Sequence, residues 1–516
     1  MYRKLDISVL SATIVSLSLC ATVFLTLDDY GVTWDEPAYF LAGEEYAKWL
    51  RSPSVFTIDR HWRINHEHPP FAKVLGGIST YIFKEQLQLF DGIVAYRISN
   101  LFFVFLLTFF LFLFASRLYG NLVAFFVVLF LSLLPRVFFH SHLGALDYPV
   151  TAMWFVVFYC YWRGIEEQKW ILAAVVALGF ALLTKINALF LYVPILFWWS
   201  WIYQKEIVHI AKSICRGGWK ERPLETKPVL SKILPLLIIP GVIFFVFWPW
   251  LWKDPFNRAF KYFYFHLEHF PIPTYYFGTR YLSPPWHLPL VLSVATVPIL
   301  IWVLFIIGGI GRGLDKDSRP IVLMNLFFPI LLVVLGPSKH DGVRLFLPAF
   351  PFLAIVAGAG LHYLLSWVKA TKWSFPFGVG FFVIYSLTVN ASVVKYHPYQ
   401  SSYFNELIGG VNGARKSGLE LHYWCSSYLA IIPWLNRHRD KVLWVPICRD
   451  PFSIYVREGR LKQNVRLGEE AKSDYLILMA RFGMMDEHMW DYYERKDRLV
   501  SVRVSETEIL GIYELD

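Results

Sequence analysis

Long apolar runs, separated by short polar segments, fill the sequence from residue 7 to residue 393. A helix of about 20 apolar residues crosses the hydrocarbon core of a bilayer. About eleven runs approach that length and are predicted to be transmembrane helices: Ile7–Leu27, Ile93–Ala115, Leu118–Leu134, Pro149–Tyr161, Trp170–Leu183, Ala188–Ile202, Ile233–Leu251, Leu288–Ile310, Ile321–Leu335, Leu345–Val368 and Phe375–Val393. The pattern therefore predicts a polytopic α-helical membrane protein. Its first run is too long for the apolar part of a signal peptide, so we expect an uncleaved span.

Two shorter amphipathic or apolar segments follow the first run. In Pro37–Leu50, aromatic and aliphatic residues recur at helical spacing, which predicts an amphipathic helix lying in the membrane interface. Phe71–Phe83 is too short to cross a bilayer comfortably and is predicted to be a second interfacial helix. The first external loop is thus expected to carry two interfacial helices.

The apolar character falls after Lys395. Short β-like runs at Val442–Ile447, Tyr475–Leu478 and Leu499–Val504 alternate with charged, helical stretches. This change predicts a small soluble α/β domain over residues 395–516, following a transmembrane domain over residues 1–394.

Composition and charge agree with a membrane protein. Only 17% of the residues are charged, whereas soluble proteins carry about 25%. The net charge of +10 does not require a nucleic-acid partner, because membrane proteins concentrate Lys and Arg in cytoplasmic loops. The basic segments are Met1–Lys4, Lys205–Lys232, Gly311–Arg319 and Lys369–Lys372. They place the N-terminus in the cytoplasm, and an odd number of spans then places the C-terminal domain outside.

Cysteine usage gives little support to a zinc or redox site. The five cysteines are Cys20, Cys160, Cys215, Cys425 and Cys448, and no CxxC pair occurs among them. Only Cys425 and Cys448, both in the C-terminal region, are placed where they could pair.

Ionisable side chains gather on the predicted external side. The first external loop, Tyr30–Lys73, contains Asp35, Glu36, His61, His66, Glu67 and His68. Later external segments contribute His140, His142, Asp147, Lys185, His266, His269, Arg280, Trp286, His287, Lys339, His340, Asp341 and Arg344. Charged groups beside or within apolar spans are costly and are therefore candidates for a functional site. We expect these distant segments to meet at one site on the external rim of the bilayer.

The residue types suggest a division of labour. A carboxylate such as Asp35 can act as a general base on an attacking hydroxyl. Lysine and arginine side chains bind phosphate, arginine through its planar fork and lysine as a point charge. Together they would permit attack on a sugar carbon with a phosphate as the leaving group.

Simpler interpretations remain open for each group. Asp35, Glu36 and Asp147 could merely cap the helices that follow them. Lys185 could extend to the membrane interface, and Lys339 and Arg344 could be ordinary charges beside a span. The histidines match no standard zinc spacing, so no metal or other cofactor is predicted to be required, although a divalent ion stays open.

The ordered set of motifs resembles the GT-C glycosyltransferases. WDEP at Trp34–Pro37 and HEHPPFAK at His66–Lys73 are similar to the protein O-mannosyltransferase family and its prokaryotic relatives, which include the aminoarabinose transferases of lipid A. Further segments with this resemblance are Asp147, TKINALFLYVP from Thr184, PPWHLP from Pro284, KHDGVRLFLPAFPFLA from Lys339 and HPYQSSYFNELIGG from His397.

The resemblance implies an inverting transfer of a sugar from an undecaprenyl- or dolichyl-phosphate carrier. The acceptor would be a protein Ser/Thr hydroxyl, a glycan or a glycolipid at the external face of the cell membrane, with no nucleic-acid partner. By resemblance Asp35 is the base and Glu36 supports it. The residues implied for the donor phosphate or substrate are His68, Lys73, Asp147, Lys185, His287, Lys339, His340 and Arg344.

A transporter or flippase for a lipid-linked polar substrate is the alternative. Such a protein would need charged residues deep in its spans and paired internal repeats. The sequence displays neither feature, and its long external loops and soluble tail favour an enzyme.

Overall fold

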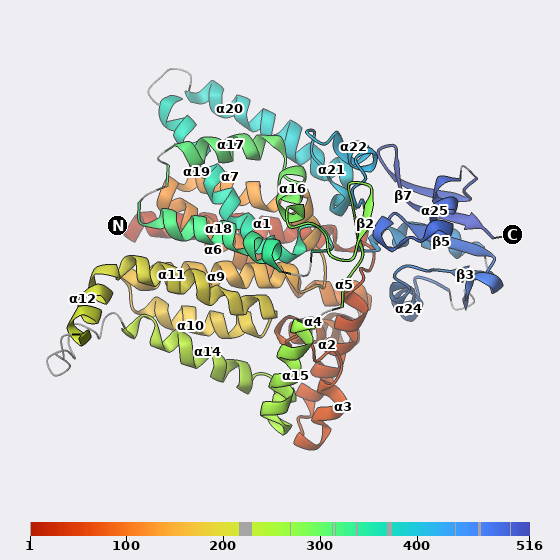
Figure 1. Cartoon of the computed structure of the whole chain (residues 1–516), viewed down its shortest axis with the longest axis horizontal. Helices are drawn as coiled ribbons and strands as arrows, with labels where there is room; N and C mark the ends of the chain where they lie inside the picture. Colours follow the sequence, from red (N-terminus) through yellow and green to blue (C-terminus); the bar gives the residue numbers. More distant parts are fainter. Residues whose placement is uncertain are drawn as a thin grey trace.

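The computed structural model describes residues 2–215, 230–268, 270–311, 313–314, 316–336, 339–368, 374–438, 440–462, 466–495 and 497–515. His269, Lys369–Lys372 and residues 216–229 of the basic segment Lys205–Lys232 lie outside these ranges. The described residues form a long helical bundle with a small sheet beyond one end (Figure 1). The N-terminus lies at the opposite end of the bundle from the sheet, which holds the C-terminus.

Each of the predicted apolar runs contains a helix. The bundle helices are α1 (Tyr2–Leu25), α6 (Asn100–Tyr119), α7 (Asn121–Ser132), α9 (Asp147–Glu166), α10 (Lys169–Leu182), α11 (Tyr192–Ile202), α14 (Leu234–Val246), α17 (Ile299–Ile310), α18 (Ser318–Leu335), α19 (Phe350–Val368) and α20 (Ser374–Tyr385). By length and composition, five helices of the described part could cross a membrane, or up to seven if each bent pair counts as one span. The number of eleven spans therefore stays a prediction.

One predicted span is bent, and another is followed by a bend. α16 (Leu288–Ala295) meets α17 at 109° inside the predicted span Leu288–Ile310, and α7 turns by 78° into α8 (Pro135–Ser141), just after the predicted span Leu118–Leu134. Proline explains both bends, because it lacks an N–H and disfavours helical geometry in the residue before it. Leu134, before Pro135, is extended at φ −64° and ψ 120°, and Pro298 follows the end of α16. The prediction of one continuous helix over Leu288–Ile310 was therefore wrong.

Four short helices gather at the end of the bundle nearest the sheet (Figure 1). They are α2 (Glu36–Arg51), α3 (Ile58–Trp62), α4 (Phe71–Thr80) and α15 (Pro255–Leu267). α2 and α4 match the two predicted interfacial helices closely. These two cross at Gly43 and Gly77, where a Cβ on Gly77 would lie 1.8 Å from the Gly43 carbonyl oxygen. Only glycine permits this crossing, which fixes the position of the WDEP segment.

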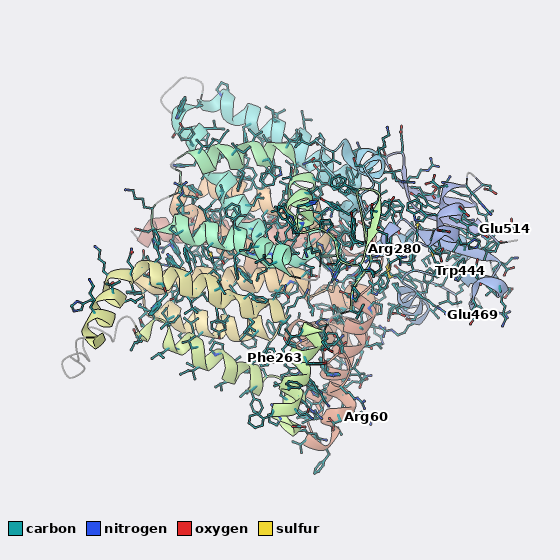
Figure 2. The ribbon with its side chains drawn as sticks, in the orientation of Figure 1. Arg60, Phe263, Arg280, Trp444, Glu469 and Glu514 are labelled. Atoms are coloured by element: carbon teal, nitrogen blue, oxygen red, sulfur yellow. A yellow bond between two sulfur atoms is a disulfide. The ribbon has the colours of Figure 1, made fainter. Side chains whose placement is uncertain are left out.

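The remaining elements lie near the C-terminal region, except α12, which lies at the other end of the bundle (Figure 1). They are α5 (Gly92–Arg97), α12 (Gln204–Cys215), α21 (Ala391–Tyr396), α22 (Gly410–Lys416), α23 (Ile432–Leu435) and the hairpin β1 (Thr274–Tyr276) and β2 (Thr279–Tyr281). Arg280 of this hairpin lies between the bundle and the sheet in Figure 2, and its Nε donates to the Gly483 carbonyl at 2.8 Å.

A five-stranded mixed sheet forms the C-terminal region, in the order β4-β3-β5-β7-β6. Its strands are β3 (Val442–Trp444), β4 (Arg466–Leu467), β5 (Tyr475–Met479), β6 (Val500–Val504) and β7 (Thr507–Glu514), with α24 (Asp450–Arg457) and α25 (Glu487–Glu494) between them. β3 pairs in parallel with β4 and β5, whereas β7 pairs antiparallel to β5 and β6. The three predicted β-like runs are confirmed as strands. The domain boundary at residue 395 stays a prediction.

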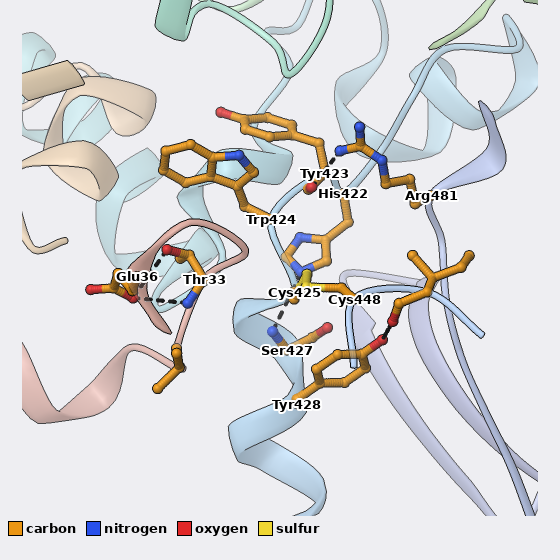
Figure 3. Close-up of a disulfide and its surroundings, with 12 residues drawn as sticks. Thr33, Glu36, His422, Tyr423, Trp424, Cys425, Ser427, Tyr428, Cys448 and Arg481 are labelled. Atoms are coloured by element: carbon orange, nitrogen blue, oxygen red, sulfur yellow. Dashed lines mark hydrogen bonds between the residues drawn. A yellow bond between two sulfur atoms is a disulfide. The ribbon is translucent and has the colours of Figure 1, made fainter. Parts of the chain in front are cut away.

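Cys425 and Cys448 form a disulfide, the pairing left open by the sequence. The bond joins the segment after the bundle to the loop that follows β3. Figure 3 shows the disulfide beside His422, Tyr423 and Trp424, close to the loop that carries Thr33 and Glu36. The disulfide thus links two segments of the C-terminal region beside Trp424, which contacts the polar cluster described next.

Candidate active site

Arg344 is the centre of the polar cluster. Its Nη1 lies 2.8 Å from Asp35 Oδ2 and 3.7 Å from Asp147 Oδ2. Its Nη2 lies 2.7 Å from Asp341 Oδ2. Three carboxylates from three distant segments therefore meet at one guanidinium.

Lys185 extends the cluster from the end of α10. Its Nζ lies 2.6 Å from Asp147 Oδ1, and both side chains are nearly buried. Asp147 is the first residue of α9, and its carboxylate contacts Lys185 and Arg344. The simpler interpretations of these two residues, a helix cap and a lysine extending to the interface, therefore do not describe the contacts that they make.

A cavity of about 700 Å³ opens beside this cluster. Its polar lining comes from Trp34, Asp35, Tyr39, Asn65, Glu67, His68, Lys185, Asn187, His266, His340, Asp341, Arg344, Asp450 and Arg481. Its apolar lining comes mainly from η4 (Ile186–Leu191), α15, α18 and the start of η7 (Arg344–Ala349), through residues such as Phe190, Phe263, Leu267, Leu332 and Val333. The cavity is thus suited to a ligand with one charged part and one long apolar part.

Asp35 has the electrostatic setting of a base. Burial raises the pKa of its carboxyl, Arg344 acts in the opposite direction, and Asp147 raises it further. Asp35 is the residue before α2, yet its side chain makes no capping bond. Oδ2 accepts from Arg344, and Oδ1 accepts no hydrogen bond from the described part of the chain. One carboxylate oxygen is therefore available for a proton.

Asp341 has the opposite setting in the same wall. Burial works against its ionisation, but Arg481 and Arg344 outweigh burial and hold the pKa of its carboxyl well below the usual range. The indole of Trp424 also donates to Asp341 Oδ2 at 3.3 Å. Asp341 therefore stays ionised and acts as an anchor for cations rather than as a base.

Glu36 faces away from the cavity and is completely buried. It forms an ion pair with Arg97 at 2.7 Å, and its carboxylate also accepts from the backbone N–H groups of Thr33 and Gly144. Arg97 donates in addition to the carbonyl oxygens of Tyr30 and Gly31. Glu36 thus holds the loop before α2 in place, which agrees with a supporting role for it next to Asp35.

Lys73 is also buried and does not line the cavity. Its Nζ donates to the Asn65 carbonyl at 2.6 Å, to Asn65 Oδ1 at 2.9 Å and to the His68 carbonyl at 2.7 Å. It therefore fixes the turn that brings Asn65, Glu67 and His68 to the cavity wall. His68 itself lines the cavity, with a buried Nδ1 that has no partner within the described ranges.

The remaining predicted site residues are divided between the cavity and its surroundings. His340 lines the cavity. Lys339 Nζ donates to the Gly336 carbonyl at 2.6 Å, and Gly336 is itself part of the lining. His287 precedes α16 and shares a hydrogen bond of 2.8 Å with the Tyr276 hydroxyl. His287 and Lys339 are outside the lining, so they support neighbouring segments instead.

The described residues contain no group of three or more His, Cys, Asp or Glu side chains arranged to hold a metal ion. His61 pairs with Glu45 at 2.8 Å, and His142 packs against Tyr30. His266 Nε2 lies 3.0 Å from the Glu67 carbonyl oxygen and lines the cavity. The expectation that no metal is required stays a prediction.

Sequence reasoning missed several side chains that form or support the polar cluster. Arg97 lies near the start of a predicted span, and Trp424 lies in the C-terminal region. Arg481 follows a predicted strand, in a segment for which no role was expected. The sequence holds only a weak signal for Arg481. It is a charged residue two positions after the apolar strand β5, and a charge at that place would ordinarily be assigned to an exposed turn.

Comparisons with known proteins agree with the geometry. Residues 67–215 match the family model described as dolichyl-phosphate-mannose-protein mannosyltransferase. Among solved structures, the chain is similar to ArnT from Cupriavidus metallidurans bound to undecaprenyl phosphate, with a TM-score of 0.50 and 14% identity over 97% of each chain. The apo structure of that protein matches over the same shares, with a TM-score of 0.47 and 15% identity. A search of the curated proteins gives no match.

The match to ArnT extends over nearly the whole chain, so the two proteins share their fold. The family model covers the segment from Glu67 to Cys215, which includes Lys73, Asp147 and Lys185. Together, the family model and the shared fold confirm the resemblance of this chain to the GT-C glycosyltransferases.

Proposed function

We propose that this chain is a membrane glycosyltransferase that moves a sugar from a polyprenyl-phosphate carrier to an acceptor hydroxyl at the external face. The observation that carries the proposal is the meeting of Asp35, Asp147, Lys185 and Arg344 beside one cavity. A base and phosphate-binding cations are the groups that such a transfer needs. The fold shared with ArnT, and the undecaprenyl phosphate bound to that protein, support this class of donor.

The transfer is a single displacement at the anomeric carbon. The Asp35 carboxylate takes the proton of the acceptor hydroxyl as the acceptor oxygen attacks. The bond between the anomeric carbon and the phosphate oxygen breaks, and its electron pair leaves with the phosphate. Lys185 and Arg344 stabilise the negative charge that grows on the phosphate. Because one displacement occurs, the configuration of the sugar inverts.

The apolar lining of the cavity supports a lipid carrier. Phe263 and Leu267 of α15 line the cavity and are also exposed at the surface. The outer face of α15 continues with Phe256, which is 91% exposed, and Phe260. Figure 2 shows Phe263 on this helix, at the end of the bundle that also carries α2 and α3. An exposed aromatic face on a short helix is typical of a helix in the membrane interface, where a polyprenyl chain could enter from the bilayer.

The C-terminal disulfide supports an external position for the site. Disulfides persist in oxidising compartments and are rare in the cytosol. The Cys425–Cys448 bond lies next to Trp424, which contacts both Arg344 and Asp341 of the cluster. The active site and the C-terminal region therefore belong on the same side of the membrane, the side that the basic segments predict to be extracytoplasmic.

The test is release of the carrier. Purified full-length protein in lipid nanodiscs would be given undecaprenyl-phosphate-linked sugars with protein, glycan or glycolipid acceptors, and free undecaprenyl phosphate would be measured by mass spectrometry. We expect acceptor-dependent release, with the sugar appearing on the acceptor in the inverted configuration. Movement of the intact lipid-linked sugar across a vesicle membrane, with no free undecaprenyl phosphate, would instead identify a transporter and overturn the proposal.

A further inference from the structure

Resting on the proposed function, we infer that Arg481, from the C-terminal region, is a phosphate-binding residue of the donor site. It follows strand β5 and lines the same cavity as Asp35, Lys185 and Arg344. No role was expected for it from the sequence. The inference makes the C-terminal region a part of the active site rather than an appended domain.

Arg481 is held rigidly at the cavity wall. Its side chain is 3% exposed, and its Nη2 lies 2.7 Å from Asp341 Oδ1. Its Nη1 donates to the backbone carbonyl of Tyr423, the bond drawn as a dashed line in Figure 3. The guanidinium also lies over the indole of Trp34, with 5.4 Å between its central carbon and the ring. A buried arginine with this much support is pre-organised for an anion.

Asp341 joins Arg481 to Arg344. Its carboxylate forms an ion pair with each: Oδ1 lies 2.7 Å from Arg481 Nη2, and Oδ2 lies 2.7 Å from Arg344 Nη2. Two like charges are thereby held side by side at the cavity, each against an indole: Arg481 against Trp34 and Arg344 against Trp424. Together with Lys185, the two guanidiniums balance the carboxylates of Asp35, Asp147 and Asp341, and without Arg481 this cluster would carry a net negative charge.

Both arginines retain an unused donor. The Nε atoms of Arg344 and Arg481 are buried and have no hydrogen-bond partner within the described ranges. A buried donor without a partner is costly, and it is rarely kept without a reason. Guanidinium forks match the geometry of phosphate oxygens, so an anion between the two side chains would supply the missing acceptors.

The proposed reaction produces an anion that needs this pair. When the bond to the sugar breaks, the carrier changes from a monoanionic phosphodiester to a dianionic phosphomonoester, and Asp35 receives the acceptor proton. Lys185 and Arg344 line the cavity but also face the carboxylates of Asp147 and Asp35. Arg481, which is paired with Asp341, adds a third cation to meet the additional charge.

Binding of undecaprenyl phosphate to full-length protein in nanodiscs tests the inference. The variants are Arg481→Gln and Arg481→Lys, with Arg503→Gln as a matched control on the same sheet. Arg503 is exposed, and its Nε donates to Ser501 Oγ at 3.0 Å. Undecaprenol, which lacks the phosphate, is the control ligand. We expect Arg481→Gln to weaken undecaprenyl phosphate binding by about tenfold or more and to leave undecaprenol binding unchanged.

A second measurement separates direct binding from an effect through Arg344. The measurement is kcat as a function of pH, which should fall at low pH as Asp35 becomes protonated; this fall is the acid limb. If Arg481 only positioned Arg344, its loss would also shift the acid limb, because Arg344 contacts the Asp35 carboxylate. We expect that limb to stay in place, and we expect Arg481→Lys to recover part of the affinity through its charge.

The outcomes distinguish this inference from the proposed function. Unchanged undecaprenyl phosphate binding in Arg481→Gln, with loss of binding in Arg344→Gln, would overturn the role of Arg481 and leave the transferase intact. A shifted acid limb would make Arg481 a positioning residue only. Equal binding of undecaprenyl phosphate and undecaprenol by the unmodified protein would remove the phosphate site altogether, and with it the proposed function.

Discussion

Arg344 and Asp35 are 309 positions apart in the sequence, and they are joined by an ion pair of 2.8 Å beside the cavity. The pair connects the segment before α2 to the segment before α19. It also couples the two halves of the proposed reaction, because the cation that meets the leaving phosphate is the cation that contacts the base. A phosphate bound at Arg344 would draw it from Asp35 and make the carboxylate more basic.

Replacing the base tests this arrangement most directly. Asp35→Asn keeps the size of the side chain but cannot accept the acceptor proton. We expect turnover to fall about 100-fold or more, as is usual for loss of a general base, with little change in undecaprenyl phosphate binding. Asp59→Asn is the matched control, since Asp59 is an exposed carboxylate on α3 paired with Lys253 and Arg258. Full turnover in Asp35→Asn would remove this residue from the mechanism.

The pH dependence of turnover follows from the same carboxylate. Burial raises the pKa of Asp35 in spite of Arg344, and only the ionised form can act as the base. Turnover should therefore be lost, as the pH falls, at a higher pH than an ordinary aspartate with a pKa of about 4 would give. Asp341 cannot cause this loss of turnover, because its pKa is held well below the usual range. A kcat profile that stays flat down to about pH 4 would contradict the assignment.

The sequence predicted what depends on local pattern. Hydropathy predicted the apolar helices, and helical spacing predicted α2. The prolines Pro135 and Pro298 are also visible in the sequence, and each indicates that a helix ends near it. The WDEP and HEHPPFAK segments directed attention to Asp35 and His68, both of which line the cavity.

Tertiary pairing could not be predicted in this way. The partner of Glu36 is Arg97, 61 positions later, and the sequence around these two residues contains no pattern that predicts the ion pair. The same holds for Asp341 with Arg481, which belong to different parts of the fold. Lys73 fits the motif well, yet its ammonium is directed to the carbonyl oxygens of Asn65 and His68 and not to the cavity. A motif thus identifies the segment, whereas packing decides which atoms reach the ligand.

The Glu36–Arg97 pair is expected to be structural. Arg97→Met would leave the Glu36 carboxylate buried without its cation, which costs about 3–5 kcal/mol. Glu36→Gln together with Arg97→Met removes both charges and should recover most of the thermal stability. Thermal unfolding of the purified variants measures both effects. If the folded fraction of Glu36→Gln lost as much turnover as Asp35→Asn, Glu36 would belong to the catalytic groups instead.

The crossing of α2 and α4 gives a prediction about packing. Gly77→Ala would place a methyl group 1.8 Å from the Gly43 carbonyl oxygen, and overpacking of this kind costs about 1–3 kcal/mol. α2 would have to move, and Asp35 with it, so both the melting temperature and turnover should fall. Gly241→Ala in α14 is the control, because a Cβ there meets nothing within 4 Å. Equal stability of the two variants would show that the crossing tolerates a side chain.

The disulfide connects redox state to the active site. Cys425 follows Trp424, whose indole lies over Arg344, with 5.0 Å between the guanidinium carbon and the ring, and donates to Asp341. Removing the bond with Cys425→Ser and Cys448→Ser frees this segment, and loss of a native disulfide typically costs about 2–5 kcal/mol. We expect a lower melting temperature and weaker binding of undecaprenyl phosphate, because Trp424 no longer orients the cation. Dithiothreitol should reproduce both changes in the unmodified protein and have no effect on the double variant. If the reductant lowered stability but left phosphate affinity unchanged, Trp424 would not orient Arg344.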